Sequence, residues 1–267
     1  MRVSIAVFSF VVVPMLSACR GSSSSVKTMP PPPAPGNYLY KGKIQSDFSI
    51  TSATTGITYP YHVYLPPNYE SSGKSYPVIY GTDAQWIFPS FPQTIDAKNK
   101  EVIFVGIEEG PRNSDRRAID YQPDGAPKYI DFLKKELIPL IEKNYRTSGE
   151  RTFVGTSYGG LLGSILLSKE PVGVPYFKNY LLFDGSFFRL QPANLQDEEA
   201  RFNASKRLDV TVVLTSASQG NVLHVNTYQT RYESRPYEGM KLLRYSYNIS
   251  HEDVAGPSFP ACLDQIY

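Results

Sequence analysis

A chain of 267 residues in which 41% are hydrophobic is long enough to bury a full core, and its composition excludes an intrinsically disordered protein. The formal net charge is only +2 and the basic residues form no long run, so the charge does not indicate binding to nucleic acid. The length suits one α/β domain, or at most two smaller ones.

The N-terminus has the layout of a secretory signal, with Arg2 before an apolar run over residues 3–16. That run is too short to be a permanent membrane span. It ends in Leu16-Ser17-Ala18-Cys19, which resembles the lipobox of bacterial lipoproteins. The resemblance implies that residues 1–18 are removed and that Cys19 is lipidated. The alternative is a plain signal peptide with an unrelated cysteine. We expect a lipid-anchored protein of the bacterial envelope, on the periplasmic side of the outer membrane.

Residues 19–37 are rich in serine and proline, a composition typical of a tether. The folded domain is therefore predicted over residues 38–267. The chain has two cysteines, and if Cys19 is lipidated then Cys262 has no partner for a disulfide. We expect Cys262 to be buried in the last helix.

Hydrophobic patterning predicts alternating strands and helices over the rest of the chain. This alternation is typical of a single α/β domain with a mostly parallel central sheet flanked by helices. The predicted helix over 127–145 contains Pro139, which is expected to interrupt it. The elements expected in chain order are two strands within 47–65, strands 76–80 and 101–107, helix 127–145, strand 151–154, helix 161–167, strands 179–183 and 209–215, helix 222–232, strand 241–247 and helix 257–266.

The pentapeptide Gly155-Thr156-Ser157-Tyr158-Gly159 has the pattern G-x-S-x-G. A predicted strand leads into it and a predicted helix leads out, which is the setting that a nucleophilic serine on a sharp turn requires. The small neighbours allow the tight turn, and the following helix directs backbone N–H groups at the site. Ser157 is thus the predicted nucleophile.

A serine nucleophile needs a general base, and the chain has three histidines. His62 lies in an early strand and His224 in a predicted helix, where both are expected to be structural or exposed. His251 follows the last predicted strand, which is where the base falls in the chain order Ser, acid, His. His251 is therefore the predicted base.

The chain resembles the esterase D-like group of α/β-hydrolases, which includes bacterial siderophore esterases, feruloyl-esterase-like proteins and S-formylglutathione hydrolase. The resemblance covers about Tyr59 to the C-terminus and implies the α/β-hydrolase fold. The segments that carry it are residues 76–80 with Asp83, residues 105–107, Arg116-Arg117 with Asp120-Tyr121, residues 136–139 with Tyr145-Arg146, residues 151–160 and residues 250–252.

The resemblance also implies how the site is lined. The backbone N–H of Tyr158, with that of Ala84 or Gln85, is expected to form an oxyanion hole. The arginines could hold an acidic or catecholic substrate, or they could form an internal ion pair that ties down a loop. The candidate substrate contacts are Trp86, Arg116, Arg117 and Tyr121.

The acid of a triad is expected just after the strand 209–215, but residues 216–221 contain no carboxylate. Three alternatives are open: a Ser-His dyad; a neutral side chain that orients the histidine, with Gln219 as the candidate; or a carboxylate from elsewhere, such as Glu233, Glu252 or Asp253. We favour the dyad or the neutral residue. Asp184 is interpreted as the end of a strand, near the site but not catalytic.

The sequence thus predicts a serine esterase that cleaves a small-molecule carboxylic ester, with a siderophore ester, or an aromatic or carbohydrate ester, as the specific hypothesis. The alternatives are an acyltransferase with the same site, and a binding lipoprotein that keeps the fold without catalysis. No cofactor is implied, and the sequence has no motif for a metal site. Besides the ester, the expected partner is the membrane, through Cys19.

Overall fold

The computed structural model describes residues 38–88, 90–111 and 114–267. The predicted signal peptide (1–18) and tether (19–37) lie outside these residues. Within the described part, none of the helices has both the length and the apolar character needed to cross a bilayer.

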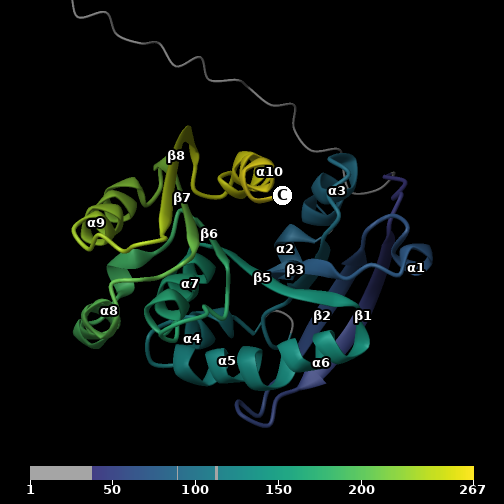
Figure 1. Ribbon diagram of the computed structural model, residues 1–267, viewed down its shortest axis with the longest axis horizontal. Coiled ribbons are helices and arrows are strands. Elements are labelled where there is room, and N and C mark those ends of the chain that lie inside the picture. Colours follow the sequence, from purple (N-terminus) through teal and green to yellow (C-terminus); the bar gives the residue numbers. More distant parts are fainter. Residues whose placement is uncertain (1–37, 89, 112–113) are drawn as a thin grey trace, which may run out of the picture. The chain divides into compact units, whose positions relative to one another are not determined.

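The domain is built on an eight-stranded sheet with the order β1-β2-β4-β3-β5-β6-β7-β8 (Figure 1). The first three strands in this order pair antiparallel, and every later pair is parallel. The mostly parallel sheet predicted from the sequence is confirmed. The strands are β1 (Lys43–Thr51), β2 (Thr58–Leu65), β3 (Tyr76–Thr82), β4 (Ile103–Ile107), β5 (Thr147–Thr156), β6 (Asn179–Phe183), β7 (Thr211–Gln219) and β8 (Lys241–Ser250).

The central strands are continuous apolar runs because both of their faces are covered. Successive side chains point to opposite faces of a strand, so each strand contributes side chains alternately to the two cores on either side of the sheet. In β6, for example, Tyr180 and Leu182 pack in one core and Leu181 and Phe183 in the other. This double burial fixes the register of the sheet, because a slip of one residue would exchange the two sets of side chains.

Helices cover both faces of the sheet (Figure 1). The short helices α2 (Ala84–Ile87) and α3 (Ser90–Ala97) share one core with α10 (Ala255–Ile266), in which Cys262 is buried as expected. The other helical elements are α1 (Tyr69–Ser72), α4 (Arg117–Asp120), α5 (Ala126–Phe132), the π-helical turn η1 (Leu133–Leu137), α6 (Ile138–Asn144), α7 (Tyr158–Ser168), the 3₁₀ turn η2 (Phe187–Arg189), α8 (Pro192–Ala204) and α9 (Val222–Glu233).

The predicted interruption at Pro139 is confirmed and takes the form of a π-helical turn. A proline inside an α-helix lacks the N–H for the i−4 bond, and its ring clashes with the i−4 carbonyl. The chain widens into η1 just before this point, so that Pro139 falls in the first turn of α6, where no N–H is needed.

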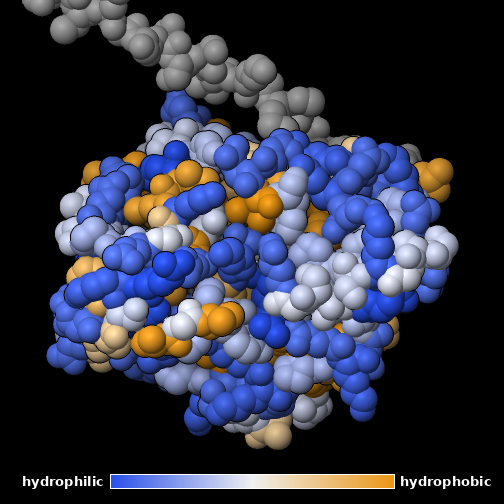
Figure 2. All heavy atoms as spheres, in the orientation of Figure 1, coloured by the Kyte–Doolittle hydropathy of each residue, from blue (hydrophilic) through white to orange (hydrophobic). Residues whose placement is uncertain are grey.

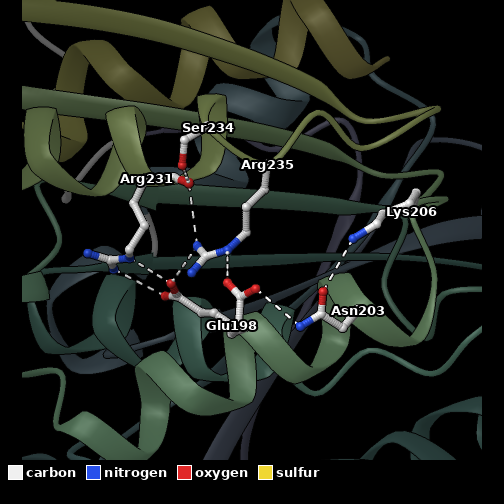
Figure 3. Close-up of polar contacts among 7 residues, drawn as sticks. Glu198, Asn203, Lys206, Arg231, Ser234 and Arg235 are labelled. Carbon is white, nitrogen blue, oxygen red and sulfur yellow. Dashed lines mark hydrogen bonds and ion pairs between the residues drawn. The ribbon is translucent and has the colours of Figure 1, made fainter.

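Helix α8 was not predicted, because its sequence is mostly polar. Its position depends instead on buried charge, since Glu198 is 2% exposed and contacts two arginines of the α9 region (Figure 3). The Nε atom of Arg231 lies 2.6 Å from Glu198 Oε2, and Nη1 of Arg235 lies 3.2 Å from the same oxygen. Elsewhere the surface seen in Figure 2 is mostly hydrophilic, with hydrophobic residues in small separate patches.

Candidate active site

Ser157 lies on a sharp turn between β5 and α7, as predicted. Its backbone has φ 59° and ψ −115°, a conformation that non-glycine residues rarely adopt. The turn is anchored to the end of the next strand, because Ser157 N–H donates to Phe183 O (2.9 Å) and Ser157 O accepts from Ser186 N–H (3.0 Å). The strained serine is therefore held by backbone bonds at both of its sides.

Gly155 is required by the closeness of this turn. A Cβ at Gly155 would lie 2.4 Å from the carbonyl carbon of Gly159 and 2.5 Å from its oxygen. Because both contacts are with backbone, no rotation of a side chain could relieve them. This explains in physical terms why G-x-S-x-G needs a glycine two residues before the serine.

His251 follows β8 and its ring contacts Asp184. The Nδ1 atom lies 2.6 Å from Asp184 Oδ2. The carboxylate is fully buried and the histidine side chain is 28% exposed. Because a carboxylate accepts hydrogen bonds, Nδ1 carries the proton of the neutral ring, which leaves Nε2 as the base nitrogen.

Asp184 was interpreted from the sequence as a strand end near the site, but its carboxylate is the one that contacts the His251 ring. It comes directly after β6, one strand earlier than the acid was expected. Its carboxylate nevertheless reaches the end of β7 and the turn after it, where it accepts N–H bonds from Ala217 (3.1 Å) and Asn221 (3.0 Å). The carboxylate thus occupies the region where an acid was expected, although its main chain lies elsewhere.

Gly220 is the sequence signal that could have revealed this arrangement. A Cβ at Gly220 would lie 2.1 Å from Asp184 Oδ2, so the loop makes room for a carboxylate that it does not itself supply. Gln219, the predicted orienting residue, is exposed at the end of β7, and its side chain is not the one that contacts the His251 ring. Neither the dyad nor the neutral residue describes this site.

Ser157 Oγ lies 3.3 Å from Ser186 Oγ, and within the described residues it forms no hydrogen bond to His251. Catalytic hydrogen bonds are often long before substrate binds, so this geometry is compatible with a serine and base that meet on binding. Ser186 follows Asp184 by two residues, which brings Ser157, Asp184 and His251 to one edge of the sheet.

The hydrogen bond that Nδ1 donates to Asp184 raises the pKa of His251 above its ordinary value of 6.5, although burial and the charge of Arg117 act in the opposite direction. A raised pKa stabilises the imidazolium that forms when a base takes a proton from a serine. The arrangement therefore has the electrostatics of a general base supported by a buried acid.

Two helix N-termini supply the candidate backbone donors. Tyr158 is the first residue of α7 and Ala84 is the first of α2. In the described residues, no hydrogen bond engages the N–H groups of Tyr158, Ala84 or Gln85. These are the donors that the predicted oxyanion hole requires, and they remain available to a developing oxyanion.

The predicted substrate contacts differ in accessibility. Trp86 is 63% exposed, whereas Tyr121 is fully buried and lies in the core, so a substrate cannot reach it in this structure. Arg116 and Arg117 both form internal ion pairs, the alternative considered from the sequence. Arg116 contacts Asp120 (2.9 Å) and Arg117 contacts Asp83 (2.8 Å).

Comparison with known proteins supports the predicted resemblance. Residues 52–175 match the model of the family described as "Putative esterase". The chain is also 27% identical over 131 residues to the uncharacterized protein YbbA of Bacillus subtilis (strain 168), a match that covers 41% of this chain and 50% of that relative. The chain thus spans about half the length of this curated relative. The family resemblance is confirmed.

Solved structures share the fold. An IroE-like serine hydrolase from Shewanella oneidensis superposes with a TM-score of 0.72 at 23% identity, covering 84% of this chain and 79% of that one. The siderophore hydrolase EstA from Aspergillus nidulans gives a TM-score of 0.66 at 18% identity, with 85% and 94% covered. The α/β-hydrolase fold predicted from the sequence is confirmed.

Proposed function

We propose that this chain, whose residues 52–175 match the putative esterase family, is a serine hydrolase of carboxylic esters. One observation carries the proposal: a strained Ser157 lies at the same sheet edge as His251, and the ring of His251 is held by the buried carboxylate of Asp184. A fold maintained only for binding has no need of a strained serine beside a histidine and acid pair.

The proposed reaction has two steps. His251 Nε2 takes the proton of Ser157 as the serine oxygen attacks the ester carbonyl, and Asp184 stabilises the imidazolium that forms. The N–H groups of Tyr158 and of Ala84 or Gln85 stabilise the negative oxygen. The imidazolium protonates the departing alcohol, leaving an acyl group on Ser157. His251 then activates a water molecule that hydrolyses this acyl-enzyme.

The substrate class is proposed from likeness and accessibility together. One structural relative is a siderophore hydrolase from Aspergillus nidulans, and the exposed ring of Trp86 can cover an aromatic or apolar part of an ester. A siderophore ester or another aromatic ester of the cell envelope is the class that we propose. The proposed location in the cell envelope rests on the lipobox-like residues 16–19.

Two alternatives differ in what they require of the site. The hypothesis of a non-catalytic binding lipoprotein drew its support from a missing acid, and the contact between Asp184 and His251 removes that support. An acyltransferase would use the same residues with an acceptor other than water. Product analysis with and without added alcohols separates transfer from hydrolysis.

Hydrolysis of p-nitrophenyl acetate and butyrate tests the proposal. We expect the purified protein to turn over these esters, and the Ser157→Ala and His251→Ala variants each to lose at least about 10³-fold in kcat, because the serine and its base act as a unit. A wild-type rate equal to that of Ser157→Ala would overturn the proposal in favour of the binding protein.

A further inference from the structure

Arg117 and Asp83 form a closed, two-point ion pair beside the nucleophile. Arg117 Nε lies 2.8 Å from Asp83 Oδ1, and Nη2 lies 3.1 Å from Oδ2. The side chains are only 12% and 4% exposed. Because the two nitrogens and the two oxygens already pair with each other, this guanidinium is engaged with the protein and is not offered to a substrate.

The same guanidinium contacts both segments that supply the proposed oxyanion donors. Its central carbon lies 5.1 Å from the ring centroid of Tyr158 and 4.9 Å from that of Trp86. Tyr158 is one donor residue. Asp83 directly precedes Ala84, the other donor, and a Cβ at Gly159 would lie 3.4 Å from Asp83 Oδ2. The Arg117 side chain therefore contacts both of the segments that carry the donors.

Besides this pair, the Thr82 side chain lies against the turn that carries Tyr158, since a Cβ at Gly159 would lie 2.4 Å from Thr82 Oγ1. The parallel register of β3 and β5 ends at the pair Gly81 and Val154, before either donor is reached. Beyond it, Asp83 is left-handed (φ 65°) and α2 is a four-residue helix, which is too short to be stable by itself. The spacing of the donors must then be held by side chains.

We infer that the Arg117–Asp83 pair is a positioning element of the oxyanion hole, which sets the distance between the N–H of Tyr158 and the N–H groups of Ala84 and Gln85. The inference rests on the proposed ester hydrolysis. Because an oxyanion needs both donors at hydrogen-bond distance at once, loss of the pair weakens binding of the transition state more than binding of the ester.

Arg117 carries a second, separable effect. Its positive charge lowers the pKa of His251, against the larger rise caused by Asp184. A substitution that keeps the positive charge but loses the planar guanidinium therefore changes only the spacing of the two oxyanion donors. A neutral substitution changes that spacing and also the pKa of His251. Lysine keeps the charge but has no planar fork to meet both oxygens of Asp83.

Kinetics of the full chain on p-nitrophenyl butyrate test the inference. We expect Arg117→Lys to lower kcat about 10- to 100-fold, the cost of misplacing a catalytic group by a fraction of an ångström to one ångström. KM should change by less than about 3-fold, because ground-state binding does not use the hole. Arg117→Gln should lose kcat similarly and also move the acidic limb of kcat/KM to higher pH. Asp83→Asn, which retains the shape, should show the kcat loss in milder form.

Arg151→Lys is the matched control. Arg151 makes the same two-point contact with Glu142 (2.6 and 3.0 Å) and lies over the Tyr176 ring (4.4 Å), but in the middle of β5, six residues before Ser157. This variant should keep the wild-type kcat.

Three results would overturn the inference: a folded Arg117→Lys protein with wild-type kcat, an equal loss of kcat in Arg151→Lys, or unfolding of both Arg117→Lys and Asp83→Asn at the assay temperature, which would make the pair a stability element. Each of these three results is informative only when the wild-type protein hydrolyses the ester. An inactive wild type whose Ser157 does not react with a fluorophosphonate would instead end the proposed function.

Discussion

Asp184 joins two segments that are distant in sequence, because its carboxylate accepts backbone N–H bonds from the end of β7 and the turn after it, and also contacts the ring of His251 after β8. The residue itself has φ 43°, which turns its side chain from β6 toward these loops. Its position could not be predicted from the order of acid and base along the chain, because the carboxylate reaches across from a neighbouring strand.

Replacement of Asp184 by asparagine tests this assignment at the residue scale. The amide would donate toward Nδ1 and favour the wrong tautomer of His251, so we expect kcat to fall by about 10⁴-fold. Gln219→Ala is the control and should keep the wild-type rate, because Gln219 lies exposed on β7. If steady-state assays instead showed a large loss of kcat in Gln219→Ala and little loss in Asp184→Asn, a neutral residue would be the one that orients the base.

The pKa of His251 provides a second measurement on the same variant. In the wild type the ring should titrate above 6.5, and in Asp184→Asn its pKa should fall, as seen in the ring-proton NMR signals. The pKa of His251 is higher in the folded protein than in the unfolded chain. The contribution of the His251–Asp184 pair to the stability of the fold is therefore fully present below the unfolded pKa, and it is lost as pH rises through the folded pKa. Esterase activity, which needs the neutral ring, should follow the opposite trend.

At the scale of elements, the sequence was most informative where a segment is buried on both faces. The predicted range 179–183 coincides with β6, because a strand in the middle of a parallel sheet must be apolar throughout. Helix α8 and the one-turn helices α2 and α4 were missed, because buried ion pairs and loop geometry, which leave no periodic pattern, define them. The expected elements also omitted α1 and α3.

The turn that carries Ser157 should be intolerant of any side chain at Gly155. We expect Gly155→Ala to lower the free energy of unfolding by roughly 1–3 kcal/mol or more, the range for forced overpacking, because the added Cβ meets backbone at 2.4 Å. Gly256→Ala is the control, since a Cβ there meets nothing within 4 Å in α10. Urea denaturation of both variants measures the difference, and equal stability of the two would contradict the proposed tightness of the turn.

At the scale of the whole molecule, the catalytic domain is proposed to act on esters while it is held at the membrane. The proposed attachment rests on the lipobox-like residues 16–19 and on the serine- and proline-rich residues 19–37. A tether rich in proline would keep the domain clear of the lipid surface, which leaves the site open to diffusing esters.

Lipidation of Cys19 can be tested by fractionation of bacteria that express the full chain. We expect the wild-type protein in the membrane fraction, with a mass increase from the lipid on its N-terminal peptide, and Cys19→Ala in the soluble or unprocessed fraction. Cys262→Ala is the control and should fractionate as the wild type does, because Cys262 is buried. Equal fractionation of the wild type and Cys19→Ala would contradict the lipid anchor.

The central claim is that Ser157 is a nucleophile activated by His251. Reaction with a fluorophosphonate tests it most directly, because the probe bonds only to an activated serine and mass spectrometry of the digested protein locates the adduct. The account predicts one adduct per chain on the peptide that contains Ser157, none in Ser157→Ala and a greatly slowed reaction in His251→Ala. Absence of an adduct on wild-type Ser157, or equal labelling of wild type and His251→Ala, would contradict it.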